Sequence, residues 1–128
     1  MPYLADMQKA NAYVKAKQLV GNGQCVTFVH AVVTTPPASL WRRGEAVKDN
    51  KNVLPGTIIA TFDSDGHYGN RTDGSSHAAV YLFQTSGGIM VLDQWNGRTK
   101  QPSHQRLIRF KDGKGLTIDD GSQYYVVQ

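Results

Sequence analysis

The single cysteine of this 128-residue chain, Cys25, is the residue best suited to covalent chemistry, and it lies in the segment Gly21-Asn22-Gly23-Gln24-Cys25-Val26-Thr27. Glycines and a glutamine precede it and an apolar run follows, which predicts a thiol in the first turn of a helix. Free backbone N–H groups and the positive end of the helix dipole stabilise negative charge there. A thiolate in that position is a nucleophile near neutral pH, although a buried cysteine can also pack as a small apolar side chain.

A cysteine nucleophile needs a base that takes up its proton. The chain has four histidines, His30, His67, His77 and His104. His77 follows Gly74-Ser75-Ser76 and opens an apolar run, so a strand could hold it rigidly at the edge of a cleft. We therefore predict His77 as the base, with a purely structural histidine at a strand end as the alternative. His30 points away from the thiol on a helix, so we interpret it as a packing or surface residue. His67 and His104 lie in polar segments and are interpreted as surface residues, with a place in the lining of a cleft as the alternative for His67.

The base in turn needs a group that orients it, and two neighbouring residues compete for this role. Asp93 ends a predicted strand that pairs with the strand after His77, and a carboxylate there would stabilise the imidazolium. A symmetric four-residue turn at 85–88 would instead place Gln94 on the face of His77, whereas one extra residue or a bulge would restore Asp93. Asp93 could also be a simple turn acceptor, so the choice between the two stays open.

Hydrophobic patterning predicts helices followed by strands. We expect one helix within residues 1–20, ended by Gly21-Asn22-Gly23, and a second over 25–33, although its β-branched residues would also suit a strand. The expected strands are 57–62, 77–83, 89–95, 105–110 and 123–127, with a polar, glycine-rich loop at 63–76. Helices packed on a mostly antiparallel sheet of about five strands form an α+β fold, and we expect one domain over residues 1–128.

Composition excludes several classes of protein. The chain is 40% hydrophobic and 19% charged, with a net charge of +4, which is typical of a globular protein with a mildly basic surface. The basic residues lack aromatic interleaving, and no apolar run is long enough to span a bilayer, so we expect neither nucleic-acid binding nor membrane insertion. The N-terminus lacks the apolar core of a signal peptide, and the histidines lack metal-ligand spacing, so we expect no metal or other cofactor.

Four segments occur in a recognisable order: Gly23-Gln24-Cys25, Leu54-Pro55-Gly56-Thr57-Ile58, His77-Ala78-Ala79-Val80-Tyr81 and Val91-Leu92-Asp93-Gln94-Trp95. Together they resemble the CHAP/NlpC superfamily of papain-like cysteine amidases and endopeptidases. The resemblance spans residues 21–95 and is closer still to small, single-domain bacterial proteins of the BPSL-type family. It is also consistent with the amidase effectors that the type VI secretion system delivers into rival cells.

This resemblance implies a papain-like fold and cleavage of an amide bond in the peptide stems of peptidoglycan. Cys25 matches the family's nucleophile, His77 its general base, and Asp93 its acidic or amide third residue. The sequence departs from the superfamily pattern at Thr57, where an aspartate is usual, and at Trp95, where many members carry an asparagine. The identity of the third residue is therefore the least secure part of the match.

We expect Cys25 to attack the substrate carbonyl and form an acyl-enzyme, with the oxyanion bound by the Cys25 backbone N–H and by Gln24. Trp95, Tyr68 and Trp41 are candidate walls of the substrate groove, although Trp41 also suits a core position. Two alternatives share the fold: an acyltransferase or transglutaminase-like enzyme, and an inactive cell-wall-binding module. The expected protein is a monomer made in the cytoplasm, exported by a dedicated system to act in the periplasm or at the cell wall, with an immunity protein as partner.

Overall fold

The computed structural model describes residues 2–128. Over these residues two helices, α1 (Met7–Lys15) and α2 (Cys25–Val32), precede all six strands. The strands are β1 (Arg43–Ala46), β2 (Ile58–Thr61), β3 (Ala78–Gln84), β4 (Gly88–Asn96), β5 (Lys100–Arg109) and β6 (Tyr124–Val127). Short 3-10 helices lie at Ala38–Leu40, Thr117–Asp119 and Gly121–Gln123. The structure confirms the predicted α+β class.

Helix α1 is shorter than the sequence pattern predicts. Asp6 caps its N-terminus by accepting a hydrogen bond from the backbone N–H of Lys9 at 3.1 Å. Lys17, just beyond its end, adopts a left-handed conformation with φ of 52°, which a continuing helix does not allow. The predicted extension of this helix toward residue 20 is therefore wrong. Those residues form the segment that leads into the cysteine loop.

Helix α2 begins at Cys25, as predicted. Gln24 stands at its N-cap with extended backbone, and Val33 leaves the helix in an extended conformation. The apolar residues Phe28, Val29 and Val32 are buried against the sheet, and this packing outweighs the strand propensity of the β-branched residues. The cysteine is thereby fixed at one end of a short, buried helix.

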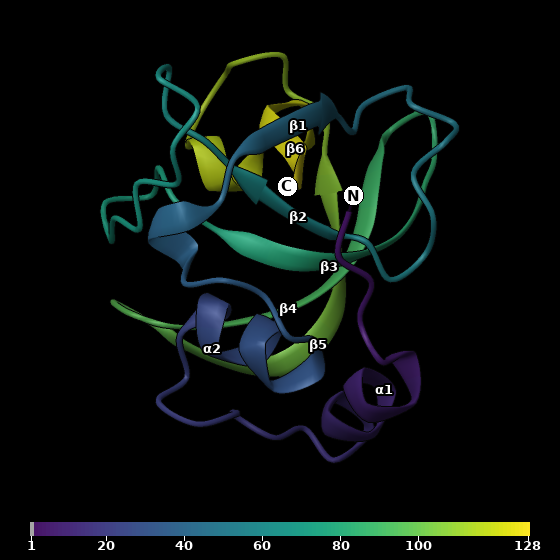
Figure 1. Cartoon of the computed structure of the whole chain (residues 1–128), viewed down its shortest axis with the longest axis vertical. Coiled ribbons are helices and arrows are strands. Elements are labelled where there is room, and N and C mark those ends of the chain that lie inside the picture. The colour runs from purple at the N-terminus through teal and green to yellow at the C-terminus, as the bar shows by residue number, and fades with distance from the viewer. Residues whose placement is uncertain (1) are drawn as a thin grey trace.

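The six strands form one sheet in the order β1-β6-β2-β3-β4-β5, and every neighbouring pair is antiparallel. The sheet curls strongly, so that β1 and β6 lie at one end of the molecule and both helices cover β3–β5 at the other (Figure 1). The structure corrects the expected number of strands, because β1 is absent from the prediction. It is a four-residue, largely exposed strand that pairs with β6, about 80 residues away in the chain, so no local pattern signals it.

A bulge in the β3–β4 hairpin decides which side chains share a face. Gln84 pairs with Ile89, as a symmetric turn requires, but Tyr81 pairs with Val91 and Phe83 with Met90, leaving Leu82 without a partner. The extra residue shifts the register by one. As a result, Asp93 shares the face of Tyr81 and of the residues that continue back to His77.

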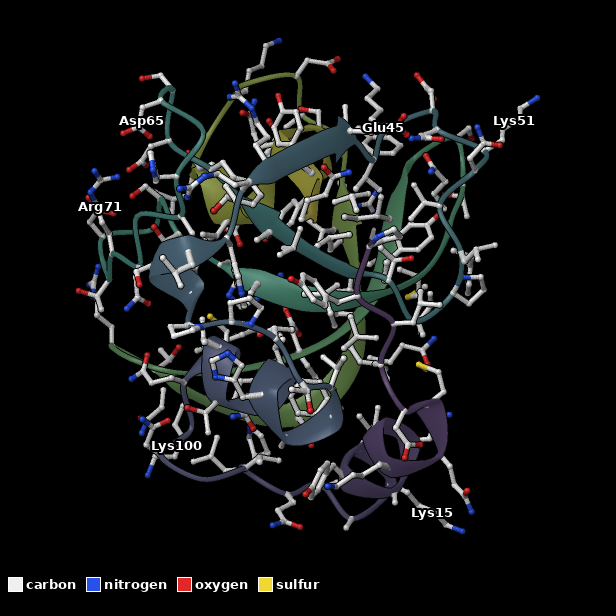
Figure 2. The ribbon with its side chains drawn as sticks, in the orientation of Figure 1. Lys15, Glu45, Lys51, Asp65, Arg71 and Lys100 are labelled. Carbon is white, nitrogen blue, oxygen red and sulfur yellow. The ribbon has the colours of Figure 1, made fainter. Side chains whose placement is uncertain are left out.

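The sheet separates two apolar clusters. One lies between the sheet and the helices, and includes Phe28, Trp41, Val80 and Leu92. The other fills the concave side of the curled sheet and includes Ile59, Tyr81, Val91 and Tyr124. Charged side chains such as Lys15, Arg71 and Lys100 lie at the periphery (Figure 2). Across residues 2–128, no helix has the length and apolar character needed to cross a membrane.

Candidate active site

The thiol lies where helix α2 begins. Cys25 is half-buried, and within residues 2–128 its backbone N–H has no hydrogen-bond acceptor. Gly23 has a φ of 85°, and a Cβ there would lie 2.7 Å from the Cβ of Asn96, so only glycine allows the loop to pack this closely on β4. The helix N-terminus therefore presents both a sulfur and a free N–H group to the same space.

The chain just before β3 holds His77 rigidly. Its backbone N–H donates to Thr61 Oγ1 at 3.0 Å, and its carbonyl accepts from the backbone N–H of Thr61 at 3.0 Å. The Thr61 hydroxyl in turn donates to the carbonyl of Ser75 at 3.0 Å. The imidazole is buried and contacts the rings of Trp95 and Tyr124 edge-on. Its position is thus set by the backbone of β2 as well as by its own strand.

Asp93 lies behind this imidazole. Its Oδ2 atom is 2.7 Å from His77 Nε2, and its carboxylate is completely buried. Because Nε2 donates to the carboxylate, Nδ1 is the ring nitrogen left for the thiol. The bulge at Leu82 places Asp93 on this face, whereas a symmetric turn without a bulge would have placed Gln94 there.

The charges of the three groups reinforce one another. Burial opposes ionisation of His77, but the hydrogen bond to Asp93 and the interaction with Cys25 raise the pKa of the imidazole to about 9. Burial likewise opposes the thiolate, yet interaction with His77, the Tyr68 hydroxyl and the backbone N–H of Ala78 lowers the pKa of Cys25. These opposite shifts favour a thiolate–imidazolium pair.

Gln94, the alternative third residue, points to the other face of β4. Its buried side chain accepts from the backbone N–H of Val20 at 2.7 Å and donates to the carbonyls of Val20 and Gln24, both at 2.9 Å. Gln94 therefore ties the loop that carries the cysteine to the strand that carries Asp93. Gln94 thus contacts the cysteine loop, and Asp93 is the residue that contacts His77.

Tyr68 contacts the thiol directly. Its hydroxyl oxygen lies 3.6 Å from Cys25 Sγ, and its ring is buried among apolar residues. Burial and the neighbouring Cys25 raise the pKa of the phenol far above its usual value, so the hydroxyl keeps its proton. The structure corrects the prediction that Tyr68 is a groove wall, since it is a buried hydrogen-bonding neighbour of the sulfur.

The two tryptophans occupy different environments. Trp41 is completely buried beside Tyr68, and its indole N–H donates to the Pro36 carbonyl, so its assignment to a groove wall is wrong. Trp95 is half-buried beside His77, at a ring distance of 6.3 Å, and stays a candidate for substrate contact. Gln24 is exposed, and its side-chain amide donates to the carbonyl of Asn96 at 3.1 Å.

Two residues of β5 complete the surroundings of Asp93, and the sequence analysis missed both. Arg106 Nε donates to Asp93 Oδ2 at 2.9 Å. His104 Nε2 lies 3.0 Å from Asp93 Oδ1, so its interpretation as a packing or surface residue is wrong. Burial opposes ionisation of Asp93, but His104, His77 and Arg106 hold the pKa of the carboxyl below its usual range. Only the pairing of β4 with β5 brings these side chains together.

The other histidines lie apart from the thiol. His30 is exposed and contacts the ring of Trp41, and His67 is exposed next to Asp65. Over residues 2–128, no group of three or more histidine, cysteine or acidic side chains has the arrangement of a metal site.

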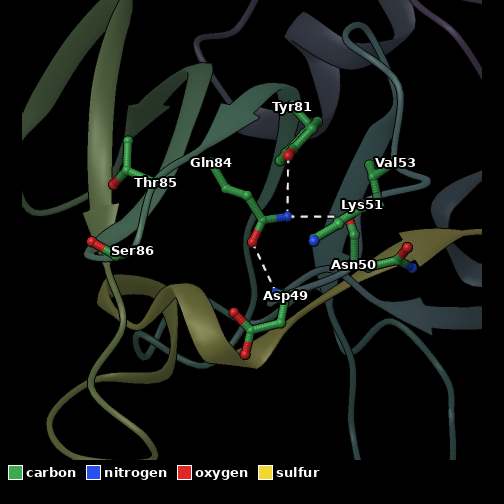
Figure 3. A pocket seen from close by; sticks show the side chains of 8 residues that line it. All are labelled: Asp49, Asn50, Lys51, Val53, Tyr81, Gln84, Thr85 and Ser86. Atoms are coloured by element: carbon green, nitrogen blue, oxygen red, sulfur yellow. Dashed lines mark hydrogen bonds between the residues drawn. The ribbon is translucent and has the colours of Figure 1, made fainter.

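A surface hollow of about 490 Å³ is a separate feature, lined by Asp49, Lys51, Tyr81, Gln84 and neighbouring residues (Figure 3). Tyr81 lies four residues after His77, or about 13 Å along the chain. The Gln84 amide donates to the Val47 carbonyl and accepts from the backbone N–H of Asp49, so it serves to hold the loop at 47–50.

The fold and this cluster define an α+β protein with a thiol–imidazole–carboxylate centre. The chain belongs to the domesticated amidase effector 2 family, whose model matches residues 5–127. It is 38% identical over 123 residues to the type VI secretion amidase effector 2 protein of Salmonella typhi, covering 95% of this chain and 89% of that protein. These matches confirm the predicted resemblance to type VI secretion amidase effectors.

Two further comparisons agree. The chain is 37% identical over 89 residues to domesticated amidase effector 2 of Ixodes scapularis, covering 69% of this chain and 56% of that protein. A solved structure of type 6 secretion amidase effector 2 superposes with a TM-score of 0.74 and 36% identity, covering 91% of each chain.

The ion pair predicts unusual thiol reactivity. At pH 6.5, iodoacetamide should alkylate Cys25 at least about tenfold faster than a free cysteine with a pKa near 8.5, because the thiolate is already present. The variant His77→Ala should lose this enhancement and react only as the pH rises, whereas the control His67→Ala should behave like the wild type. Mass spectrometry of the alkylated protein across pH 5–9 measures both, and an ordinary thiol profile in the wild type would contradict the ion pair.

We call the three hydrogen bonds between the Gln94 side chain and the cysteine loop the Gln94 clamp. This clamp gives a prediction for the stability of the protein. Gln94→Leu roughly keeps the size of the side chain but removes three hydrogen bonds to the cysteine loop and leaves the buried Val20 N–H without its acceptor. We expect a loss of about 2–4 kcal/mol in the free energy of unfolding, together with slower alkylation of Cys25. Urea unfolding measures the loss, and the exposed β5 residue Gln105, changed to Leu, serves as control. Equal stability of the two variants would show that the clamp contributes nothing.

Proposed function

We propose that this protein is a peptidoglycan amidase that cleaves an amide bond in cell-wall stem peptides through a cysteine acyl-enzyme. The observation that carries the proposal is the 2.7 Å hydrogen bond between His77 Nε2 and the buried Asp93 carboxylate, together with a Cys25 thiol that lies at the N-terminus of a helix and has its pKa lowered by its interaction with His77. This is the minimal set for thiol-dependent acyl transfer: a nucleophile, a base and a group that orients the base. Membership in a family of amidase effectors supports the same reaction class.

In the first half of the reaction, the Cys25 thiolate attacks the carbonyl carbon of the scissile amide and its oxygen becomes an oxyanion. When this intermediate collapses, the C–N bond breaks and the imidazolium of His77 gives its Nδ1 proton to the leaving amine. A thioester on Cys25 remains. His77 is now neutral and still hydrogen-bonded through Nε2 to Asp93, which keeps Nδ1 directed at the sulfur.

In the second half, His77 Nδ1 accepts a proton from water as the water oxygen attacks the thioester. Collapse of the second intermediate releases the carboxylate product and restores the thiolate–imidazolium pair. Asp93 stays ionised throughout, because its pKa lies below the usual range and its negative charge is balanced by the imidazolium.

Two donors lie near the Cys25 sulfur, which supports a role for them in binding the oxyanion. The backbone N–H of Cys25 has no acceptor within residues 2–128, and the Tyr68 hydroxyl lies 3.6 Å from the sulfur. Both would be free to donate to a developing negative charge in a largely buried site. Gln24 is a weaker candidate for this role, because its side-chain amide already donates to the Asn96 carbonyl.

The arrangement also supports the papain-like comparison made from the sequence. A helix presents the cysteine, and the strands of an antiparallel sheet present the histidine and the third residue. We further propose that the protein is exported to act on the cell wall of another bacterium, and that a dedicated immunity protein protects the producing cell. The relatives' description as type VI secretion effectors supports this setting.

The direct test uses purified peptidoglycan. Wild-type protein should release peptide fragments with new amine and carboxyl ends, seen by mass spectrometry of the soluble products. Cys25→Ala should abolish release without altering the fold, because the loss is a single sulfur atom at the end of a helix. Digestion by the Cys25→Ala variant at the wild-type rate would refute a cysteine mechanism, and no digestion by the wild type would refute the substrate.

The proposed oxyanion donor gives a second test. Tyr68→Phe removes one hydroxyl and retains the packed ring, so we expect kcat to fall about 100-fold with little change in KM or stability. Tyr125→Phe is the matched control, because Tyr125 contacts Phe62 and Arg43 rather than the thiol. Equal kcat values for the two variants would remove Tyr68 from the mechanism.

A further inference from the structure

The orientation of Asp93 depends on one of its two oxygens. Oδ2 accepts from His77 Nε2 at 2.7 Å and from Arg106 Nε at 2.9 Å. Oδ1 lies 3.0 Å from His104 Nε2, but the alignment is too poor for a hydrogen bond, and neither atom has another partner within residues 2–128. The carboxylate is therefore held by two donors on Oδ2, and a second histidine, His104, contacts its other oxygen.

Arg106 is itself held in place. Its guanidinium lies 4.9 Å from the centre of the Trp95 ring, a stacking contact typical of arginine, and Nη1 lies 3.9 Å from a carboxylate oxygen of Asp119. Four-fifths of its side chain is buried, with 21% exposed. The planar guanidinium is thus a fixed donor to the same carboxylate oxygen that accepts from His77.

We propose that Arg106 is a positioning residue that keeps the Oδ2 atom of the Asp93 carboxylate directed at His77 Nε2. The proposal deepens the proposed function, since it concerns the same centre, but it is stated for the thiol and can be tested without any cell-wall substrate. Arg106 acts through Asp93 and contacts neither the sulfur nor the position of the substrate carbonyl.

The direction of the effect follows from these contacts. Without Arg106, Oδ2 loses one of its two donors and is less firmly held toward His77, and the buried charge loses a compensating cation. His77 then loses support for its protonated form, and the thiolate loses its partner. The acid limb of the alkylation profile, where Cys25 loses reactivity as its thiolate is protonated, should therefore move to higher pH.

Every charged or titratable group around Asp93 enters this balance. The set consists of His77 before β3, His104 and Arg106 on β5, Asp119 at the end of a 3-10 helix, Tyr124 at the start of β6, and Cys25 on α2. Burial raises the pKa of Tyr124, so this phenol stays neutral. The variants below change Arg106 and leave all the other members intact.

The experiment is the pH profile of Cys25 alkylation by iodoacetamide, measured on the full chain. Arg106→Met retains an extended side chain against Trp95 but removes the donor and the charge. We expect its acid limb to shift upward by about one pH unit, which is a tenfold lower rate at a fixed pH on that limb. Arg106→Lys retains the charge without the planar Nε donor, and should shift in the same direction by less.

Arg109→Met is the matched control, because Arg109 lies on the same strand, is exposed and forms no ion pair with any residue of 2–128. Its profile should coincide with that of the wild type. Thermal melting checks that each variant is folded, and if Arg106→Met does not fold, Arg106→Lys carries the test alone. An unchanged acid limb in folded Arg106 variants, or a shift to lower pH, would overturn the proposal. Failure of the wild type to digest peptidoglycan would refute the proposed substrate and leave this result standing.

Discussion

The buried carboxylate of Asp93 is the constraint around which this structure is organised. An ionised group with no exposure to water is tolerated only when donors and opposite charges surround it, and here His77 and Arg106 both donate to one of its oxygens. These donors come from the segment before β3 and from β5, on either side of β4. The centre of the sheet must therefore form in its native register before the carboxylate can be buried. The imidazole owes part of its raised pKa to that group, and the imidazole in turn lowers the pKa of the thiol.

Two consecutive residues of β4 serve the two faces of the sheet. Asp93 faces the concave side and contacts His77, whereas Gln94 faces the helices and binds the loop before Cys25. Because successive side chains of a strand point in opposite directions, one strand places the base and also anchors the nucleophile. The distance between sulfur and imidazole is thus set by rigid secondary structure rather than by a mobile loop, which is what a preorganised site requires.

The parts of the fold that local patterns encode could be predicted. The helix that starts at Cys25, the strand that follows His77 and the hairpin ending near Asp93 each follow from turn residues and hydrophobic periodicity within about ten residues. The limits of this approach are seen at α1, whose end is set by a left-handed Lys17, and at β1, whose only partner strand is remote in sequence. Neither feature has a strong local signal. The tryptophans show the same limit, since burial of Trp41 depends on how distant elements pack.

The sequence by itself determined the chemistry available to this protein: one thiol at a helix start, a histidine at a strand start, and an acid–amide pair on the adjacent strand. It did not decide between Asp93 and Gln94, because one residue of register exchanges them, and only the bulge at Leu82 places the carboxylate on the histidine. Nor did it reveal Tyr68, His104 or Arg106, which reach the site through contacts between distant segments. Tertiary structure decided these matters because the faces of strands and the burial of charge are properties of the assembled sheet.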